Sequence, residues 1–198
     1  MAAVDIAPAF VRYAYVEERR APSGVAYAAA TGANLPFRAA SFDFAVAFMS
    51  FMDLMDPDRA LAEVFRVLKP GGFFQFSITH PCYDTPIRRW VEGEDGRKAA
   101  LAVGDYFRPV RGDVCEWIFC AAPEELKKQY PKFRIPIYHR PLSAWLNAII
   151  DAGFVLERGG EPRPDEAALG RWPDLYDAGI VAFYFHFLCR KPRAVPGR

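Results

Sequence analysis

The sequence predicts an α/β fold, and three observations lead to that class. β-rich runs alternate with helical patterns through the first half of the chain, as in parallel βαβ units. The apolar run Phe42–Phe48 has the composition of a strand buried on both faces. The 198 residues, 52% of them hydrophobic, suffice for one domain with a sizeable core. We therefore expect a single domain over 1–198, built on a mostly parallel sheet.

The first elements form a strand–helix–strand series. Residues 2–6 read as a strand that ends in an acid, and residues 8–20 as a helix whose first turn tolerates proline. A short strand follows at Val25–Tyr27. Residues 29–41 then form a loop before the apolar strand.

The next helix has a clear start and stop. Asp56 is an N-cap acid and Pro57 occupies the first helical position. An apolar stripe at helical spacing follows, formed by Leu61, Val64, Phe65 and Leu68. The sequence Lys69–Gly72 predicts the end of this helix, and Phe73–Ile78 predicts another strand.

Residues 80–121 change character, because prolines, glycines, charges and aromatic residues occur there without clear periodicity. A segment this long inside a domain is usually functional or disordered. Its aromatic residues favour order, so we interpret it as a substrate-facing insertion or lid. Regular patterns return with a helical stripe at 142–150, a strand at 154–156, a polar excursion at 162–180 and a last strand at 180–189.

Composition argues against several functions. The net charge of +1 lacks the basic excess of a nucleic-acid-binding protein, and no apolar run reaches the roughly 20 residues of a membrane span. The start has no secretory pattern. The four cysteines fit neither a zinc site nor a disulfide scaffold, so we expect reduced thiols, no metal and a cytoplasmic protein.

Several motifs in order carry a resemblance to a known family. They are "LPFRAASFDFAVAF", "RVLKPGGFFQFSI", "ITHP" and "AWLNAIIDAGF". The series resembles the class I S-adenosylmethionine-dependent methyltransferases, in particular the small-molecule group called methyltransferase type 11. The resemblance implies a Rossmann-like fold with helices on both faces of the sheet and an antiparallel last strand. It also implies S-adenosylmethionine as the cofactor.

The resemblance assigns the cofactor contacts position by position. Asp5 matches the acid that accepts hydrogen bonds from the ribose hydroxyls, and Ile6 would pack on the adenine. Thr31 stands where the family has an acid or asparagine near the adenine amino group, with backbone N–H groups available at Gly32 and Ala33. The segment Phe48–Met49 follows the strand beside which the sulfonium lies in the family, although core packing explains both residues equally well.

One part of the family pattern is absent. No Gly-x-Gly occurs in the 198 residues, whereas in the family a strand, a glycine-rich loop and a helix precede the acid matched by Asp5. We therefore expect an N-terminally truncated form of the fold. Three explanations stay open: a truncated sequence, a missing strand supplied by a second chain, or loss of cofactor binding.

The later motifs supply candidates for the acceptor side. His80 and His139 are possible general bases for a hydroxyl acceptor, because histidine titrates in the right range. Each could instead serve only to hold a loop. Tyr106 lies in the insertion, and Tyr138 and Arg140 flank His139 in a stretch that resembles a substrate-facing loop of the subgroup.

The sequence thus predicts a methyltransferase acting on a small molecule, without nucleic-acid or membrane partners. The alternative is a catalytically inactive methyltransferase-like module that binds a protein partner. The missing central strand would leave two strands facing a gap. We expect either that these strands pair directly, or that a homodimer or another partner covers the open edge.

Overall fold

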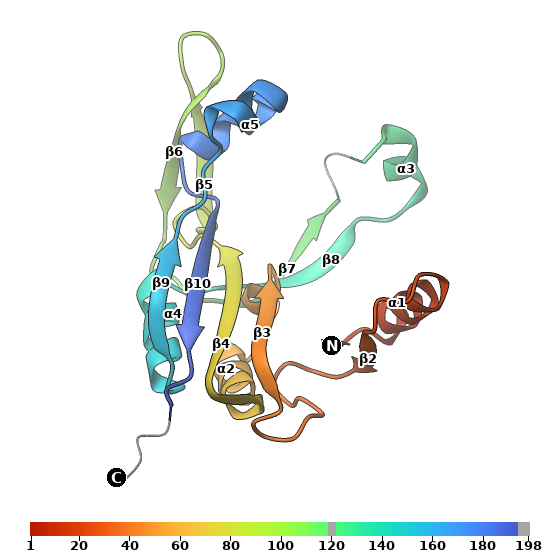
Figure 1. Cartoon of the computed structure of the whole chain (residues 1–198). Helices are drawn as coiled ribbons and strands as arrows, with labels where there is room; N and C mark the ends of the chain where they lie inside the picture. The colour runs from red at the N-terminus through yellow and green to blue at the C-terminus, as the bar shows by residue number, and fades with distance from the viewer. Residues whose placement is uncertain (119–121, 194–198) are drawn as a thin grey trace.

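The structure is a computed structural model that describes residues 1–118 and 122–193 (Figure 1). The described strands are β1 (Ala2–Asp5), β2 (Ala26–Ala29), β3 (Phe42–Phe48), β4 (Leu68–Thr79), β5 (Ile87–Glu92), β6 (Lys98–Gly104), β7 (Val110–Trp117), β8 (Phe133–His139), β9 (Val155–Gly160) and β10 (Tyr184–Arg190). The described helices are α1 (Pro8–Arg20), α2 (Pro57–Val67), α3 (Glu124–Gln129), α4 (Leu142–Asp151) and α5 (Glu166–Arg171), with 3-10 turns η1 (Phe51–Asp53) and η2 (Pro173–Gly179). None of these helices is both long and apolar enough to cross a bilayer.

The central sheet has four strands in the order β3-β4-β10-β9. β3 pairs with β4 in parallel, whereas β10 pairs antiparallel with both β4 and β9. β3, β4 and β9 therefore run in one direction and only β10 is reversed, which confirms the antiparallel last strand. Because the reversed strand lies inside the sheet, two of the three strand pairings in the sheet are antiparallel. The sheet is therefore mixed rather than mostly parallel.

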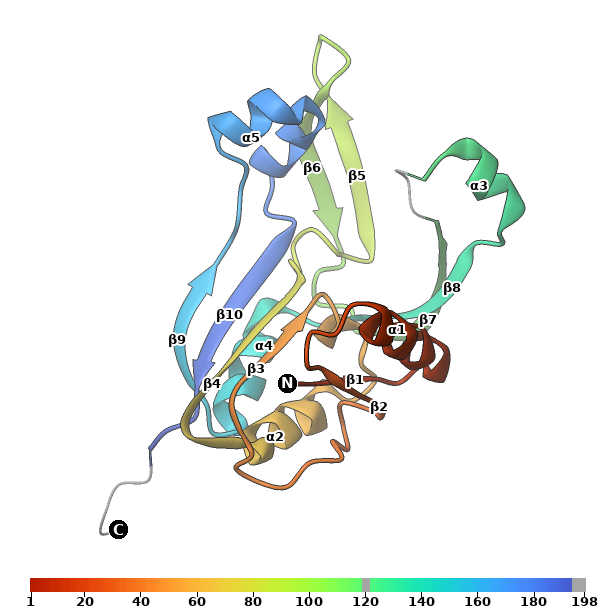
Figure 2. The ribbon, with the colours of Figure 1, turned by 45° about the vertical axis from the view of Figure 1, so that its right-hand side comes forward.

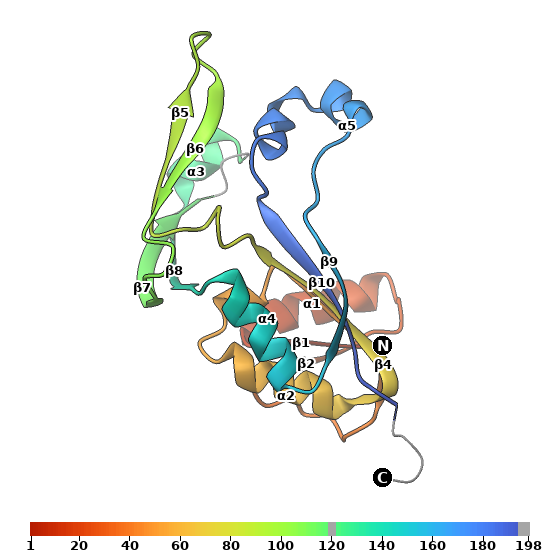
Figure 3. The same cartoon turned by 90° about the vertical axis from the view of Figure 1, so that its left-hand side faces the viewer.

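The core lies between this sheet and two helices, α2 and α4 (Figure 3). β4 contributes Phe74, Phe76 and Ile78 to it, with Leu61 of α2 and Ile149 of α4 packed against them. All five side chains are at most 1% exposed. The alternation along β4 directs every second residue to the helices, as the period of a strand requires.

The opposite face of the sheet has no such cover, which corrects the prediction of helices on both faces. The helices α1, α3 and α5 contain no buried residue. On β3 the side chains of Phe44, Val46 and Phe48 are 49%, 53% and 57% exposed. The expectation that Phe42–Phe48 is buried on both faces is therefore wrong, since only one face of this strand meets helices.

The N-terminal strands form a separate sheet. β1 pairs in parallel with β2 and with no other described strand, and α1 packs on this pair. The views in Figures 1 and 2 show β1, β2 and α1 together beside the free edge of β3. Direct pairing of β1 with β3, one of the two expected repairs of the gap, is thus not found in the described part of the chain.

The predicted insertion, residues 80–121, contains regular structure. β5 and β6 form one antiparallel hairpin, and β7 pairs with β8, which lies beyond the predicted limit of the insertion. Figure 2 shows both pairs extending away from the central sheet. Residues 119–121, with Cys120, lie outside the described residues. The strands lack strict alternation of polar and apolar residues, which is why periodicity did not indicate them.

The Lys69–Gly72 stretch joins α2 to β4 without a separate turn, because the strand already begins at Leu68. Gly71 has φ of +82°, a conformation that favours glycine. A Cβ atom on Gly72 would lie 2.8 Å from the backbone oxygen of Asp43 on the neighbouring strand. Gly72 is therefore required for the close approach of β3 and β4, and Gly71 for the backbone conformation of this stretch.

Candidate functional site

Asp5 ends β1 with an exposed carboxylate. Its Oδ1 accepts a hydrogen bond from the backbone N–H of Ala7 at 2.7 Å, at the start of α1. The second oxygen has no partner among the described residues. Ile6 beside it is 74% exposed, so this strand end offers one free carboxylate oxygen and one apolar side chain to a ligand.

The loop from Thr31 to Ala33 lies against the start of α2. The hydroxyl of Thr31 accepts from the N–H of Ala33 at 3.3 Å, so both groups are already engaged. A Cβ atom on Gly32 would lie 3.6 Å from Leu54 and 3.7 Å from Ala60. This loop is therefore packed on the helix. A ligand contact from the N–H of Ala33 would have to replace this hydrogen bond, whereas the hydroxyl of Thr31 keeps its own O–H for a ligand.

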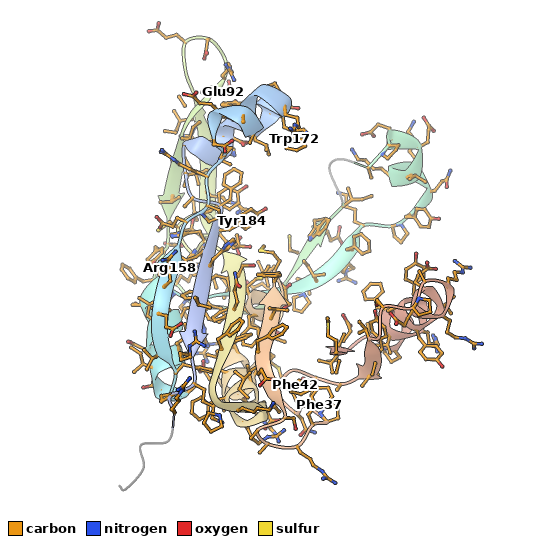
Figure 4. The ribbon with its side chains drawn as sticks, in the orientation of Figure 1. Phe37, Phe42, Glu92, Arg158, Trp172 and Tyr184 are labelled. Atoms are coloured by element: carbon orange, nitrogen blue, oxygen red, sulfur yellow. The ribbon has the colours of Figure 1, made fainter. Side chains whose placement is uncertain are left out.

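The next turn, Leu35–Phe37, is held by an ion pair on α2. Glu63 accepts from the backbone N–H of Leu35 at 2.8 Å, and Arg66 donates to the backbone oxygens of Phe37 at 2.7 Å and Leu35 at 3.1 Å. Arg66 also donates to both oxygens of Glu63. Phe37 in turn packs edge-on against Phe42 at 4.9 Å (Figure 4). The Glu63–Arg66 ion pair therefore holds this loop at the start of β3.

Phe48 and Met49 close β3 at its carboxyl end. Met49 has φ of +51°, in the left-handed region, and its N–H donates to the backbone oxygen and hydroxyl of Ser77 on β4. Phe48 is 57% exposed, so core packing does not explain its position. The chain turns sharply here and enters η1.

His80 is a buried residue with both ring nitrogens engaged. Its Nδ1 accepts from the backbone N–H of Cys82 at 3.0 Å, so in the neutral ring the proton sits on Nε2. Nε2 lies 3.1 Å from Oε1 of Glu161 and donates to it. A second proton on the ring would break the Cys82 bond. His80 thus joins two loops and has no free lone pair for a base.

His139 differs from His80 in this respect. Its Nε2 lies 2.7 Å from the backbone oxygen of Tyr106, which can only accept, so Nε2 carries the proton. Nδ1 then has a free lone pair and no partner among the described residues. Every fully buried side-chain nitrogen or oxygen of those residues has a partner, so Nδ1 must reach solvent. His139 is held in the form of the ring that a general base requires.

His139 lines a cavity of about 1030 Å³ between α2, α4 and the β7–β8 pair. Tyr138 and Arg140 line the same cavity, whereas the hydroxyl of Tyr106 accepts from the N–H of Leu142 beneath it. Arg140 donates to Oδ1 of Asp58 at 2.7 Å. The structure therefore brings together the predicted acceptor residues His139, Tyr106, Tyr138 and Arg140, and leaves His80 outside this cavity.

Other residues of these sites were not indicated by the sequence. Glu161 and Asp58 are distant in sequence from their partners, and only folding reveals the pairs. Arg111 lines the cavity and has no acid partner among the described residues. Its position opposite Tyr138 in the β7–β8 pair depends on a hairpin that periodicity did not show.

Comparisons with known proteins match parts of this chain to methyltransferases. The methyltransferase domain family matches residues 1–76. An O-methyltransferase of Penicillium expansum is 38% identical over 73 residues, which are 35% of this chain and 26% of that protein. A probable phthiotriol/phenolphthiotriol dimycocerosates methyltransferase of Mycobacterium ulcerans is 28% identical over 138 residues, 66% of this chain and 49% of that protein. The chain thus spans half or less of the length of these relatives.

Solved structures show the same fold over nearly the whole chain. An S-adenosylmethionine-dependent methyltransferase from Mesorhizobium loti is 24% identical with a TM-score of 0.75, covering 96% of this chain and 79% of that one. A second, from Listeria monocytogenes, is 19% identical with a TM-score of 0.73, covering 97% and 79%. At this identity the likeness concerns the fold alone.

Proposed function

We propose that the chain is a class I S-adenosylmethionine-dependent methyltransferase and that it transfers a methyl group to a small-molecule acceptor. The observation that carries the proposal is the match of residues 1–76 to the methyltransferase domain. Relatives named as O- and C-methyltransferases support a small acceptor. An oxygen acceptor fits His139 best, since it needs a base.

The described residues fit the cofactor on one side only. Asp5, with a free carboxylate oxygen, and the exposed Ile6 suit the adenosine half. The methionine half needs a close backbone approach, which glycine permits, between β1 and β3. β1 and β3 belong to different sheets, and no strand of the described residues joins them. The described residues therefore do not complete a site for the whole cofactor.

The chain's own residues act on the acceptor side. His139 would accept the hydroxyl proton at Nδ1 while its Nε2–H stays on Tyr106. Tyr138 and Arg140 would orient the acceptor in the cavity. Positioning contributes much of the rate in such displacements.

The proposal includes a homodimer and a cytoplasmic location. The exposed edge and apolar face of β3 favour a second copy as cover. Cys82, Cys115 and Cys189 are free thiols, as is usual in a reducing compartment.

Incubation with methyl-labelled S-adenosylmethionine and a panel of phenols, amines and activated carbon acids tests the function. We expect label on a phenol. If the chain neither binds the cofactor at millimolar concentration nor transfers label to any acceptor, this result contradicts the enzymatic function and favours a binding module.

A further inference from the structure

The cavity beside His139 has the size of a site for a small organic molecule. Its volume of about 1030 Å³ is comparable with pockets for drug-sized ligands, which span about 300–1,000 Å³. Met52, Leu54 and Val110 contribute apolar wall. Where α2 and α4 meet, alanines such as Ala62 and Ala148 extend this apolar wall. An apolar body of one or two rings therefore has room here.

Two guanidinium groups line the same space. Arg140 uses one nitrogen on Asp58 and stacks on Trp145 at 5.0 Å, which leaves further N–H donors. Arg111 is exposed and has no described acid partner, so its charge is not neutralised locally. Exposed arginines without acids occur elsewhere, as at Arg89. What distinguishes Arg111 is that it borders a cavity.

The β7–β8 pair contributes both an arginine and the histidine base to the lining of the cavity. Arg111 is opposite Tyr138 and Val110 is opposite His139, so these two pairs lie on alternate faces of the strands, and all four residues line the cavity. The cavity therefore offers a cationic group, an apolar wall and a base within one space. Guanidinium binds carboxylate or phosphate through two parallel hydrogen bonds, which is a more specific contact than a single charge.

Resting on the methyltransferase function proposed above, we propose that the acceptor is a hydroxylated organic anion. Its carboxylate or phosphate binds Arg111 and Arg140, its apolar body contacts the wall of the cavity, and its hydroxyl donates to Nδ1 of His139. The anionic group anchors the molecule, and the base receives the hydroxyl proton when the oxygen is methylated.

Calorimetry on the chain without cofactor tests the anion contact, with para-coumarate as the probe. We expect para-coumarate to bind about tenfold more tightly than its neutral amide, the equivalent of about 1.4 kcal/mol. Arg111→Gln should abolish this preference, and Arg140→Gln should reduce it. Arg89→Gln is the matched control, because Arg89 is also an exposed arginine without a described partner but lies on β5, outside the cavity.

Proton NMR tests the hydroxyl contact, since the chain contains only three histidines. We expect para-coumarate to shift the ring signal of His139 and not those of His80 and His186. Para-methoxycinnamate, which lacks the hydroxyl, should bind with a smaller shift.

The outcomes separate this inference from the proposed function. Equal affinity for acid and amide, no binding of either, or a preference that survives Arg111→Gln would overturn the inference. Methylation of a hydroxylated organic anion at an unchanged rate in Arg111→Gln would do so while the function stands. Selective binding of para-coumarate without methylation of any hydroxylated anion would instead contradict the function.

Discussion

At the scale of residues, the two candidate bases are separated by their hydrogen bonds. The sequence presents His80 and His139 alike, each followed by a proline within two residues. The structure gives His80 an N–H donor on one nitrogen and a carboxylate on the other. His139, which lines the cavity, keeps one ring nitrogen without a described partner. Exposure alone does not distinguish them, since both are buried.

Replacement of each histidine by glutamine should separate the two roles. His139→Gln keeps an N–H donor for Tyr106 but loses the base, so we expect kcat for an oxygen acceptor to fall about 10²–10⁴-fold. His80→Gln should lower thermal stability and leave the pH profile of kcat unchanged. A His139→Gln enzyme with the wild-type pH profile would show that this ring only holds the loop.

Asp5 governs the adenosine side. We expect residues 1–198 to bind S-adenosylmethionine weakly, with a dissociation constant above the low micromolar range, because the described residues supply no methionine contact. Where binding is measurable, Asp5→Ala should weaken it by about 1–3 kcal/mol, as for a lost charge-assisted hydrogen bond. Asp165→Ala is the control, because that acid likewise accepts from a backbone N–H at a helix start, in α5.

Calorimetry with S-adenosylmethionine measures both effects. A dissociation constant in the low micromolar range for the unmodified chain would refute the inference that its site for the methionine half of the cofactor is incomplete.

At the scale of elements, the ion pair on α2 determines where the Leu35–Phe37 loop lies. Glu63 and Arg66 bind the backbone of this loop on both sides. The hydrogen bond from Arg66 lowers the pKa of Glu63 below its usual value, and the backbone N–H of Leu35 lowers it further. Pro36 shapes the turn of this loop, and the Glu63–Arg66 ion pair attaches the loop to α2.

Glu63→Gln should therefore destabilise the fold by about 1–3 kcal/mol, since it removes a charged acceptor of several hydrogen bonds. The pKa of Glu63 is lower in the folded chain than the ordinary value of a glutamate. Its contribution is therefore full above the unfolded pKa and is lost as the pH falls through the lowered folded pKa. Denaturant unfolding of both proteins across this acidic range measures it.

Glu157→Gln is the control, because Glu157 also pairs with an arginine, Arg190, but binds no loop. Equal losses in the two variants would show that the attachment of the loop adds nothing to the ion pair.

At the scale of the whole molecule, the open edge of β3 is the main exposed feature. This strand has a partner on one side only, and its Phe44, Val46 and Phe48 side chains face water. Covering one such side chain fully would contribute about 1.5–3 kcal/mol. Unpaired edges with apolar side chains recruit other chains.

We therefore expect the chain to self-associate through β3. Val46→Lys should dissociate the assembly, because it places a charge in the middle of the edge strand. Val103→Lys should not, although Val103 on β6 is similarly exposed, at 49% against 53%. Light scattering after size-exclusion chromatography measures the mass of each protein. A monomeric wild type, or a Val46→Lys variant that remains associated, would argue against a second copy as the cover.

The elements of this protein were largely determined by local sequence. The helices from Pro8 and Pro57 and the strand from Phe42 lie where the pattern predicts, because proline, the N-cap acid Asp56 and apolar spacing act within a few residues. Tertiary structure alone decided that Phe44 is exposed and that Arg111 and His139 line one cavity. Burial depends on what covers a strand, and contact between distant residues depends on strand pairing. Neither property is encoded within the short window in which a pattern is visible.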